Sequence, residues 1–260
     1  MTRFDDIRKF AQYSYSRSGI IEPDTHYAMN SEKVMEVLSA YNPEVIVKTG
    51  VGSGRLLADM AAATKAFLVV VEPSLEVIES FIQDHAGSDI LEKIRFINGE
   101  FNNFPVDYYA ADLIVCIDYL NFVESGKVID EFRRALQFDG ILFVATTVLN
   151  EEDMDGLLDE YTRNMFPLHN EYYMPDELRT VLTLNEFKFI KGSMDSYESD
   201  MQAARLFFSG HFGGAEKETG ELLGENNDAF NRYYGLHEGK ISVPYYSGVF
   251  MRIKPDHLKV

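Results

Sequence analysis

The sequence predicts an α/β core in which a mostly parallel sheet lies between layers of helices. Short apolar runs alternate with amphipathic stretches from residue 44 to about residue 147, as in repeated strand–helix units. The apolar runs are continuous, so their strands are expected to be covered on both faces. A glycine-rich turn follows the first run and leads into a helix, as in nucleotide-binding α/β folds.

Each element of this central region is delimited by a local signal. Proline and serine at 73–74 open a helix, because proline suits the first helical turn, and the turn at 138–140 closes another. The expected strands are 45–47, 67–71, 94–97, 113–117 and 141–145, and the expected helices are 53–63, 73 to about 83, and 124–136.

The flanking regions are less regular. Residues 1–40 are predicted to form an N-terminal helical lid segment, with helices at 4–15 and 31–41 around a polar break. Residues 41–194 and 241–260 are expected to form the core, including a helix at 176–184 and strands at 187–190 and 246–253. The long segment 195–240 is predicted to be an insertion that serves as a lid or an oligomer contact.

Composition restricts the partners of the chain. A net charge of -18 argues against nucleic acid or an anionic membrane surface, because both would repel the protein. No apolar segment has the length of a membrane span and the start lacks a secretory signal, so a cytoplasmic location is expected. The sequence has a single cysteine, Cys116, which excludes a disulfide framework. This cysteine lies in an apolar run and is expected in the core.

The glycine loop at residues 50–54 has the spacing GxGxG. A dinucleotide-binding turn requires a small residue where Arg55 stands, and a P-loop requires a Gly-Lys-Ser/Thr sequence that is absent. The loop therefore suits a nucleoside ligand without a pyrophosphate. Glu72 ends the second strand about twenty residues later, where a carboxylate accepts hydrogen bonds from ribose hydroxyls. Capping of the following helix is the alternative interpretation of Glu72.

Two further segments follow expected strands and belong to the same ligand-binding edge of the sheet. Glu100 and Phe101 would place an acceptor and an aromatic ring beside an adenine, although a simple turn explains them equally well. Asp118 and Tyr119 come directly after the fourth strand.

In this order, the segments resemble a class I S-adenosylmethionine-dependent methyltransferase over roughly residues 40–147. The resemblance is carried by the succession 45–54, 72–74, 98–100, 111–116 and 134–142. It implies a Rossmann-like sandwich with helices on both faces and a seven-stranded sheet whose last strand, here 246–253, is antiparallel. It also implies S-adenosylmethionine as the cofactor and S-adenosylhomocysteine as its product.

The same resemblance assigns roles to the candidate cofactor-binding residues. The glycines would line the methionine part, Glu72 would hold the ribose, and Glu100 with Phe101 would border the adenine. Asp118 and Tyr119 would lie beneath the sulfonium. The complete candidate set is Lys48, Gly50, Val51, Gly52, Gly54, Glu72, Pro73, Glu100, Phe101, Asp118 and Tyr119.

Lys48 departs from the family pattern, which usually has Asp or Glu at this position. Lysine reverses the sign of the local charge, and a poorly solvated like-charge contact with the ammonium group of the cofactor is costly. Three outcomes are open: Lys48 pairs with a carboxylate such as Glu72 or Asp118, it binds an anionic part of the ligand, or cofactor binding is weakened or lost. Pairing is expected, because strand-end acids are plentiful.

Catalytic residues are left unassigned, because a base is needed only when the acceptor loses a proton. His26, Tyr27 and Asp118 are the candidates. The first two belong to the N-terminal segment, which often covers the cofactor in this superfamily, and Asp118 follows the fourth strand. His169, His211 and His237 were weighed against surface or structural roles. No cluster has metal-ligand spacing, so no metal is predicted.

Two main hypotheses result. The first is methyl transfer to a small-molecule acceptor, in a possible homodimer, with tyrosines of the flanking segments either walling the acceptor pocket or covering the core. The second, based on Lys48, is a methyltransferase-like protein with weakened or altered cofactor binding that acts by binding a ligand or partner. A nicotinamide-dependent oxidoreductase is a distant third.

Overall fold

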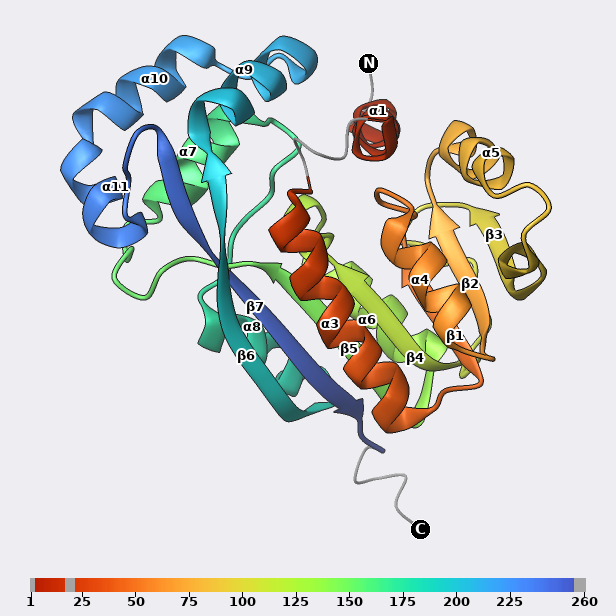
Figure 1. Cartoon of the computed structure of the whole chain (residues 1–260). Coiled ribbons are helices and arrows are strands. Elements are labelled where there is room, and N and C mark those ends of the chain that lie inside the picture. The colour runs from red at the N-terminus through yellow and green to blue at the C-terminus, as the bar shows by residue number, and fades with distance from the viewer. Residues whose placement is uncertain (1–2, 17–21, 255–260) are drawn as a thin grey trace.

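A seven-stranded sheet forms the centre of the molecule in the computed structural model, which describes residues 3–16 and 22–254 (Figure 1). The strand order is β3-β2-β1-β4-β5-β7-β6, and β7 runs antiparallel to both of its neighbours. The predicted fold class is therefore confirmed. The strands are β1 (Val45–Thr49), β2 (Phe67–Glu72), β3 (Ile94–Asn98), β4 (Ala111–Ile117), β5 (Leu136–Thr147), β6 (Phe187–Asp200) and β7 (Lys240–Arg252).

Helices cover both faces of the sheet, as the continuous apolar strands predicted. One face packs against α3 (Asp24–Tyr41), α4 (Arg55–Ala63) and α5 (Leu75–Asp84), and its core contains Val34, Leu57 and Phe81. The other face packs against α6 (Ser125–Ala135) and α8 (Pro175–Leu184), around Phe132 and Leu182. Short 3₁₀ turns, η1 (Asp89–Lys93) and η2 (Leu120–Phe122), complete the connections.

A third apolar cluster lies beyond the carboxyl-edge ends of the sheet. It is formed by α7 (Leu157–Met165), α9 (Met201–Phe212), α10 (Glu216–Glu225) and α11 (Asn227–Tyr234), which gather at one end of β6 and β7 (Figure 1). Tyr161, Phe230 and Tyr234 are its largest buried side chains. We call these four helices the helical cap.

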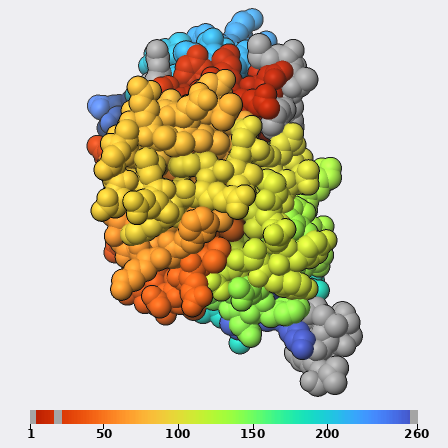
Figure 2. Space-filling model, turned by 90° about the vertical axis from the view of Figure 1, so that its right-hand side faces the viewer, coloured from red at the N-terminus to blue at the C-terminus, as the bar shows by residue number. Residues whose placement is uncertain are grey.

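The N-terminal helix α1 (Arg3–Ser16) connects the cap to the first layer of helices. Figure 2 shows its red surface between the orange and yellow surface around α5 and the blue surface of the C-terminal helices. The Tyr15 hydroxyl donates a hydrogen bond to Asp84 of α5 at 2.5 Å, and Lys9 donates to the backbone oxygen of His211 in α9. The helix therefore spans the upper edge of the sheet.

Several element boundaries differ from the sequence predictions. The helix expected at 31–41 begins at Asp24, and α7 was not predicted. The turn expected at 138–140 lies inside β5, where Asp139 has a φ of 64° and the register with β4 shifts. The strand expected at 187–190 continues to Asp200 and pairs with β7 along this length. Only one face of the added part is covered, so it lacks the continuous apolar run by which the other strands were predicted. Residues 195–200 of the expected insertion are therefore strand.

The lid role predicted for 1–40 and 195–240 stays a prediction, and part of the polar break between the N-terminal helices lies outside the described residues. Over the ranges 3–16 and 22–254, none of the helices combines the length and the apolar character needed to cross a membrane.

Candidate functional site

A cavity of about 260 Å³ opens at the carboxyl edge of the parallel strands. One half, which we call the sheet edge, is formed by the tips of β1, β2 and β4 and by the glycine loop at 50–54. The other half is formed by α7 and α9 of the helical cap, with α1 and the segment leading into α3 lying across both. Parallel register brings these tips together, since Thr49 pairs with Val71 and Lys48 with Val115.

The glycine loop turns sharply at the end of β1. Gly50, Gly52 and Gly54 have φ angles of 71°, 64° and 81°, a region that favours glycine. A side chain on Gly52 would meet no protein atom within 4 Å, and this residue lines the cavity. Gly54 does not line the cavity; a side chain there would collide with Tyr15 and Phe81. Gly54 therefore allows close packing of the loop against α1 and α5, and its predicted contact with the ligand stays a prediction.

Glu72 lies at the tip of β2 with 1% of its surface exposed. Its Oε2 accepts a hydrogen bond from the Val51 amide and its Oε1 accepts one from the Ser74 amide, both at 2.9 Å. Burial raises the pKa of Glu72 to about 6, against the opposing effects of these amides and of the Lys48 charge. The carboxylate therefore fixes the glycine loop and also borders the cavity, and its role in binding ribose stays a prediction.

The other predicted cofactor residues divide into two groups. Phe101 and Tyr119 line the cavity and their ring centroids are 3.8 Å apart, and Pro73 lines it as well. Glu100 is exposed and lies outside the cavity lining. The sequence pattern thus located the aromatic ring correctly within the cavity but not its acidic neighbour.

Lys48 is almost fully buried beneath the glycine loop, with 5% of its surface exposed. Its Nζ donates a hydrogen bond to the Gly50 oxygen at 2.7 Å and a longer one to the Thr49 oxygen at 3.5 Å. The pairing expected with Glu72 or Asp118 is not formed among the described residues, because the Lys48 ammonium group bonds these two backbone oxygens instead. Burial lowers the pKa of Lys48, partly offset by Glu22, Glu72 and Asp118.

His26 and Asp118 meet inside the cavity. Nε2 of His26 lies 3.1 Å from Oδ2 of Asp118, and the imidazole packs edge-on against Tyr197 and Tyr245. Burial lowers the pKa of His26, but the charge and the hydrogen bond of Asp118, together with the charge of Glu22, raise the pKa overall. Nδ1 of His26 is buried and has no hydrogen-bond partner.

Tyr27 lies elsewhere, although it adjoins His26 in the sequence. Its hydroxyl donates to Asp59, its ring packs 3.7 Å from the Arg55 guanidinium, and it does not line the cavity. The remaining histidines are also remote from the cavity lining: His211 packs against Tyr13 and His237 is exposed. Within the described part of the chain, no group of His, Cys, Asp and Glu side chains is arranged to hold a metal ion.

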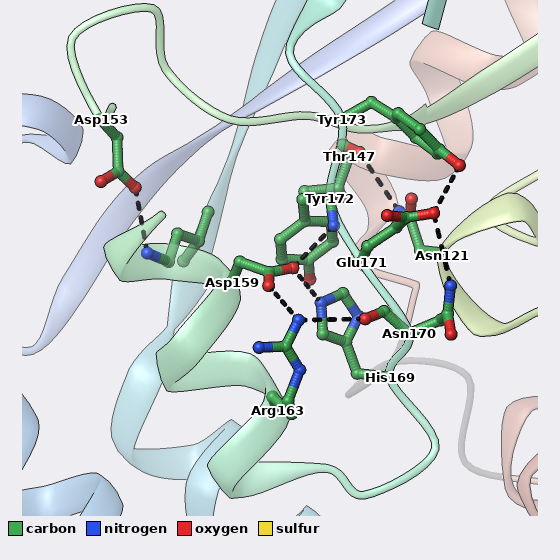
Figure 3. Close-up of polar contacts among 11 residues, drawn as sticks. Asn121, Thr147, Asp153, Asp159, Arg163, His169, Asn170, Glu171, Tyr172 and Tyr173 are labelled. Atoms are coloured by element: carbon green, nitrogen blue, oxygen red, sulfur yellow. Dashed lines mark hydrogen bonds and ion pairs between the residues drawn. The ribbon is translucent and has the colours of Figure 1, made fainter. Parts of the chain in front are cut away.

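A polar network supports the cap side of the cavity (Figure 3). Asp159 accepts hydrogen bonds from His169 Nε2 and the Tyr172 amide, both at 2.7 Å, and pairs with Arg163. Tyr172 is thereby held at the cavity wall, and burial raises the pKa of its hydroxyl. His169, weighed in the sequence as a base, is a buried partner of Asp159.

The cap half of the cavity is walled by aromatic and aliphatic side chains. Phe166 contacts the rings of Phe10, Phe122 and Phe208 at centroid distances of 5.1, 5.6 and 4.6 Å. Among the described residues, one of the tyrosines that the sequence suggested as pocket walls belongs to the lining, namely Tyr172. The suggested set was Tyr13, Tyr15, Tyr27, Tyr172, Tyr173, Tyr233, Tyr234, Tyr245 and Tyr246. Tyr161 and Tyr197 line the cavity although they were not in that set. The phenylalanines were missed, because single aromatic residues on separate helices carry no spacing signal.

Glu22 was missed as a cavity residue, and Asn121 was not singled out within the segment 118–122 that the sequence places at the ligand-binding edge. Asn121 donates through Nδ2 to the Thr147 oxygen at 3.2 Å, while its Oδ1 is buried without a partner (Figure 3). Glu22 precedes α3 and presents a buried Oε2 without a hydrogen-bond partner. No local motif marks either position.

Comparison with known proteins gives one consistent result. Residues 46–140 match the family model described as a methyltransferase domain. The chain is 26% identical over 171 residues to a Bacillus licheniformis protein named an uncharacterized methyltransferase, covering 62% of this chain and 78% of that one.

Two solved structures share the fold. One is the YcgJ protein of Bacillus subtilis, with a TM-score of 0.74, 16% identity and coverage of 88% of this chain and all of that one. The other is a geranyl diphosphate C-methyltransferase of Streptomyces coelicolor, with a TM-score of 0.63 and 12% identity over 97% of this chain and 98% of that one. The latter was solved with Mg²⁺, geranyl diphosphate and S-adenosylhomocysteine.

Proposed function

We propose that the chain is a class I S-adenosylmethionine-dependent methyltransferase that transfers the methyl group of S-adenosylmethionine to a small-molecule acceptor. The match of residues 46–140 to a methyltransferase domain and the shared fold support the proposal. The single observation that carries the proposal is the cavity at the sheet edge, where the glycine loop and Glu72 meet. In this superfamily that edge is the ligand-binding side of the sheet.

The residues present fit the cofactor. Space is left over Gly52, where a side chain would meet no protein atom, and Glu72 borders that space with lone pairs beyond the two that its backbone contacts use. In the proposal Gly50, Val51 and Gly52 hold the methionine part, Glu72 binds the ribose, and Phe101 with Pro73 and Tyr119 borders the adenine. When bound, S-adenosylmethionine supplies a methyl group already activated on a sulfonium.

The protein supplies position and a place for a proton. Tyr172, Tyr197 and the phenylalanine rings orient the acceptor, which supports an acceptor with an apolar body. His26, oriented by Asp118, takes up a proton at its unpartnered Nδ1 where the acceptor releases one. In this proposal α1 and α9 close the cavity as a lid, because both contribute to its lining.

Isothermal titration with S-adenosylmethionine and S-adenosylhomocysteine tests the cofactor half of the proposal. Wild-type protein is expected to bind both, and Glu72→Gln is expected to bind S-adenosylhomocysteine at least tenfold more weakly. Glu79→Gln, an exposed position on α5, is the matched control. Absence of heat from wild-type protein at millimolar ligand would overturn the proposal in favour of a protein that binds other ligands.

Methyl transfer itself is tested with methyl-labelled S-adenosylmethionine and an organic-solvent extract of bacterial cells. The expected result is label recovered in a small apolar product, at a rate that falls in His26→Gln. Cofactor binding without label transfer to any small molecule would contradict the acceptor class.

A further inference from the structure

Two residues of opposite charge line the cavity, and nothing in the sequence indicates that they lie close to one another. They are Lys48, at the end of β1, and Glu22, in the segment before α3. The resemblance gives position 48 to an acid, whereas this chain has a buried cation there. The negative charge expected at this place must come from another residue if an amine-bearing ligand is to bind.

The ammonium group of Lys48 forms hydrogen bonds with the glycine loop rather than an ion pair with a carboxylate. Its Nζ donates to the Gly50 oxygen at 2.7 Å, so the ammonium group is directed at the backbone that forms the glycine turn. A buried ammonium close to a second ammonium raises the free energy of binding, because little water screens the two charges. Lys48 alone therefore disfavours a cationic ligand at the loop.

Glu22 carries the opposite charge into the same space. Its Oε2 is buried and has no hydrogen-bond partner, and a buried acceptor without a donor is costly. The charge of Glu22 acts on the two cationic groups of the cavity, since it raises the pKa of both Lys48 and His26 against the lowering effect of burial. The carboxylate is thus near both groups yet has an oxygen left for a donor.

We infer that Glu22 is the carboxylate that binds the ammonium group of the ligand, taking over the charge that Lys48 removes from β1. The inference rests on the proposed function and names the group that recognises the amino-acid part of the cofactor. A primary ammonium has three donors and no acceptor, which matches a free carboxylate oxygen. Lys48 then serves the loop geometry, and the N-terminal segment becomes part of the cofactor site.

Paired ligands separate this role from a general effect on the fold. S-adenosylhomocysteine carries the amino-acid group, whereas 5′-methylthioadenosine has the same nucleoside without it. Glu22→Gln is expected to weaken S-adenosylhomocysteine at least tenfold, or about 1.4 kcal/mol, and to change 5′-methylthioadenosine less than twofold, as measured by titration calorimetry. Glu32→Gln, an exposed position on α3, is expected to change neither.

A second experiment restores an acid at position 48, to test whether the negative charge has been relocated to Glu22. In the Glu22→Gln background, Lys48→Asp is expected to recover at least threefold of the lost S-adenosylhomocysteine affinity, with 5′-methylthioadenosine binding as the measure of an intact site. Equal losses for both ligands in Glu22→Gln, or no loss for either, would overturn the inference while the proposed function stands. A wild-type protein that binds neither ligand would overturn both.

Discussion

The sheet edge and the helical cap enclose one cavity, but they hold their ligand-facing groups in different ways. At the sheet edge, Glu72 is fixed by the amides of Val51 and Ser74, and the glycine loop lines the cavity. In the cap, Phe166 and Phe208 are held by ring packing against each other and against Phe10 of α1. The first half is specified by hydrogen bonds and backbone angles, and the second by volume and shape.

Because of this difference, the two halves of the cavity are expected to respond differently to substitution. Backbone geometry at a strand end tolerates few residue types, because a positive φ or a buried carboxylate must be satisfied locally. A packed aromatic wall tolerates many combinations of equal volume. We therefore expect substitutions in the cap to alter stability and acceptor fit, and substitutions at the sheet edge to alter cofactor binding.

The largest expected effect is a loss of stability when the aromatic packing of the cap is removed. Phe166→Ala removes a side chain that is 2% exposed and contacts four rings, so it is expected to lower the free energy of unfolding by about 3–5 kcal/mol, measured by urea denaturation. Phe67→Ala, at a position that is 43% exposed, is the control and should change it by about 0.5 kcal/mol or less. A folded Phe166→Ala protein with S-adenosylhomocysteine affinity reduced more than tenfold would show that the two halves do not act separately.

The next largest effect is a loss of ligand binding when the sheet edge is altered. Gly52→Val puts a side chain into the free space over the loop and is expected to weaken S-adenosylhomocysteine at least a hundredfold, about 2.7 kcal/mol. Gly87→Val is matched for backbone strain, because Gly87 has a φ of 82° and also meets no atom within 4 Å, but it lies outside the cavity lining. Both variants should lose similar stability, and only the first should lose binding in calorimetry. Equal binding in the two would contradict the position of the ligand.

The sequence was informative in proportion to local constraint. The glycine loop, Glu72 and the strands of the central region followed from turn spacing and apolar periodicity, both of which are local. The antiparallel last strand was implied only by the family resemblance, and the strand order was not predicted. Glu22 and Phe166 carry no such signal, because their place in the cavity depends on how distant helices pack. The oligomeric state, the cytoplasmic location and the lid role of the flanking segments stay predictions.

Lys48 shows the limit most clearly. Its departure from the pattern was visible, but the group that we propose to compensate for it was not. The acid with a buried, unpartnered oxygen comes from the segment before α3, far from β1 in the sequence. Charge compensation in a cavity is a three-dimensional property, and a pattern along one strand cannot identify the compensating group.

The smallest effect sharpens the comparison through pH. Because burial raises the pKa of Glu72 from 4.5 to about 6, the folded protein binds a proton there that the unfolded chain has released between these pH values. This contribution is complete below about pH 4.5 and is lost as the pH rises through about 6, at a cost of about 2 kcal/mol. In urea denaturation, wild type is expected to lose this amount relative to Glu72→Gln between pH 4.5 and 6.5.

The binding of S-adenosylhomocysteine should change in the opposite direction over the same range, because ribose hydroxyls donate to the ionised carboxylate and not to its protonated oxygen. A wild-type affinity that rises toward pH 6.5, in a protein whose unfolding free energy falls, would link the two through one group. Glu225→Gln, at an exposed position in the cap, keeps Glu72 and should show both trends as in wild type. Parallel pH profiles in wild type and Glu72→Gln would remove Glu72 from the ligand site and leave it only the loop that it holds.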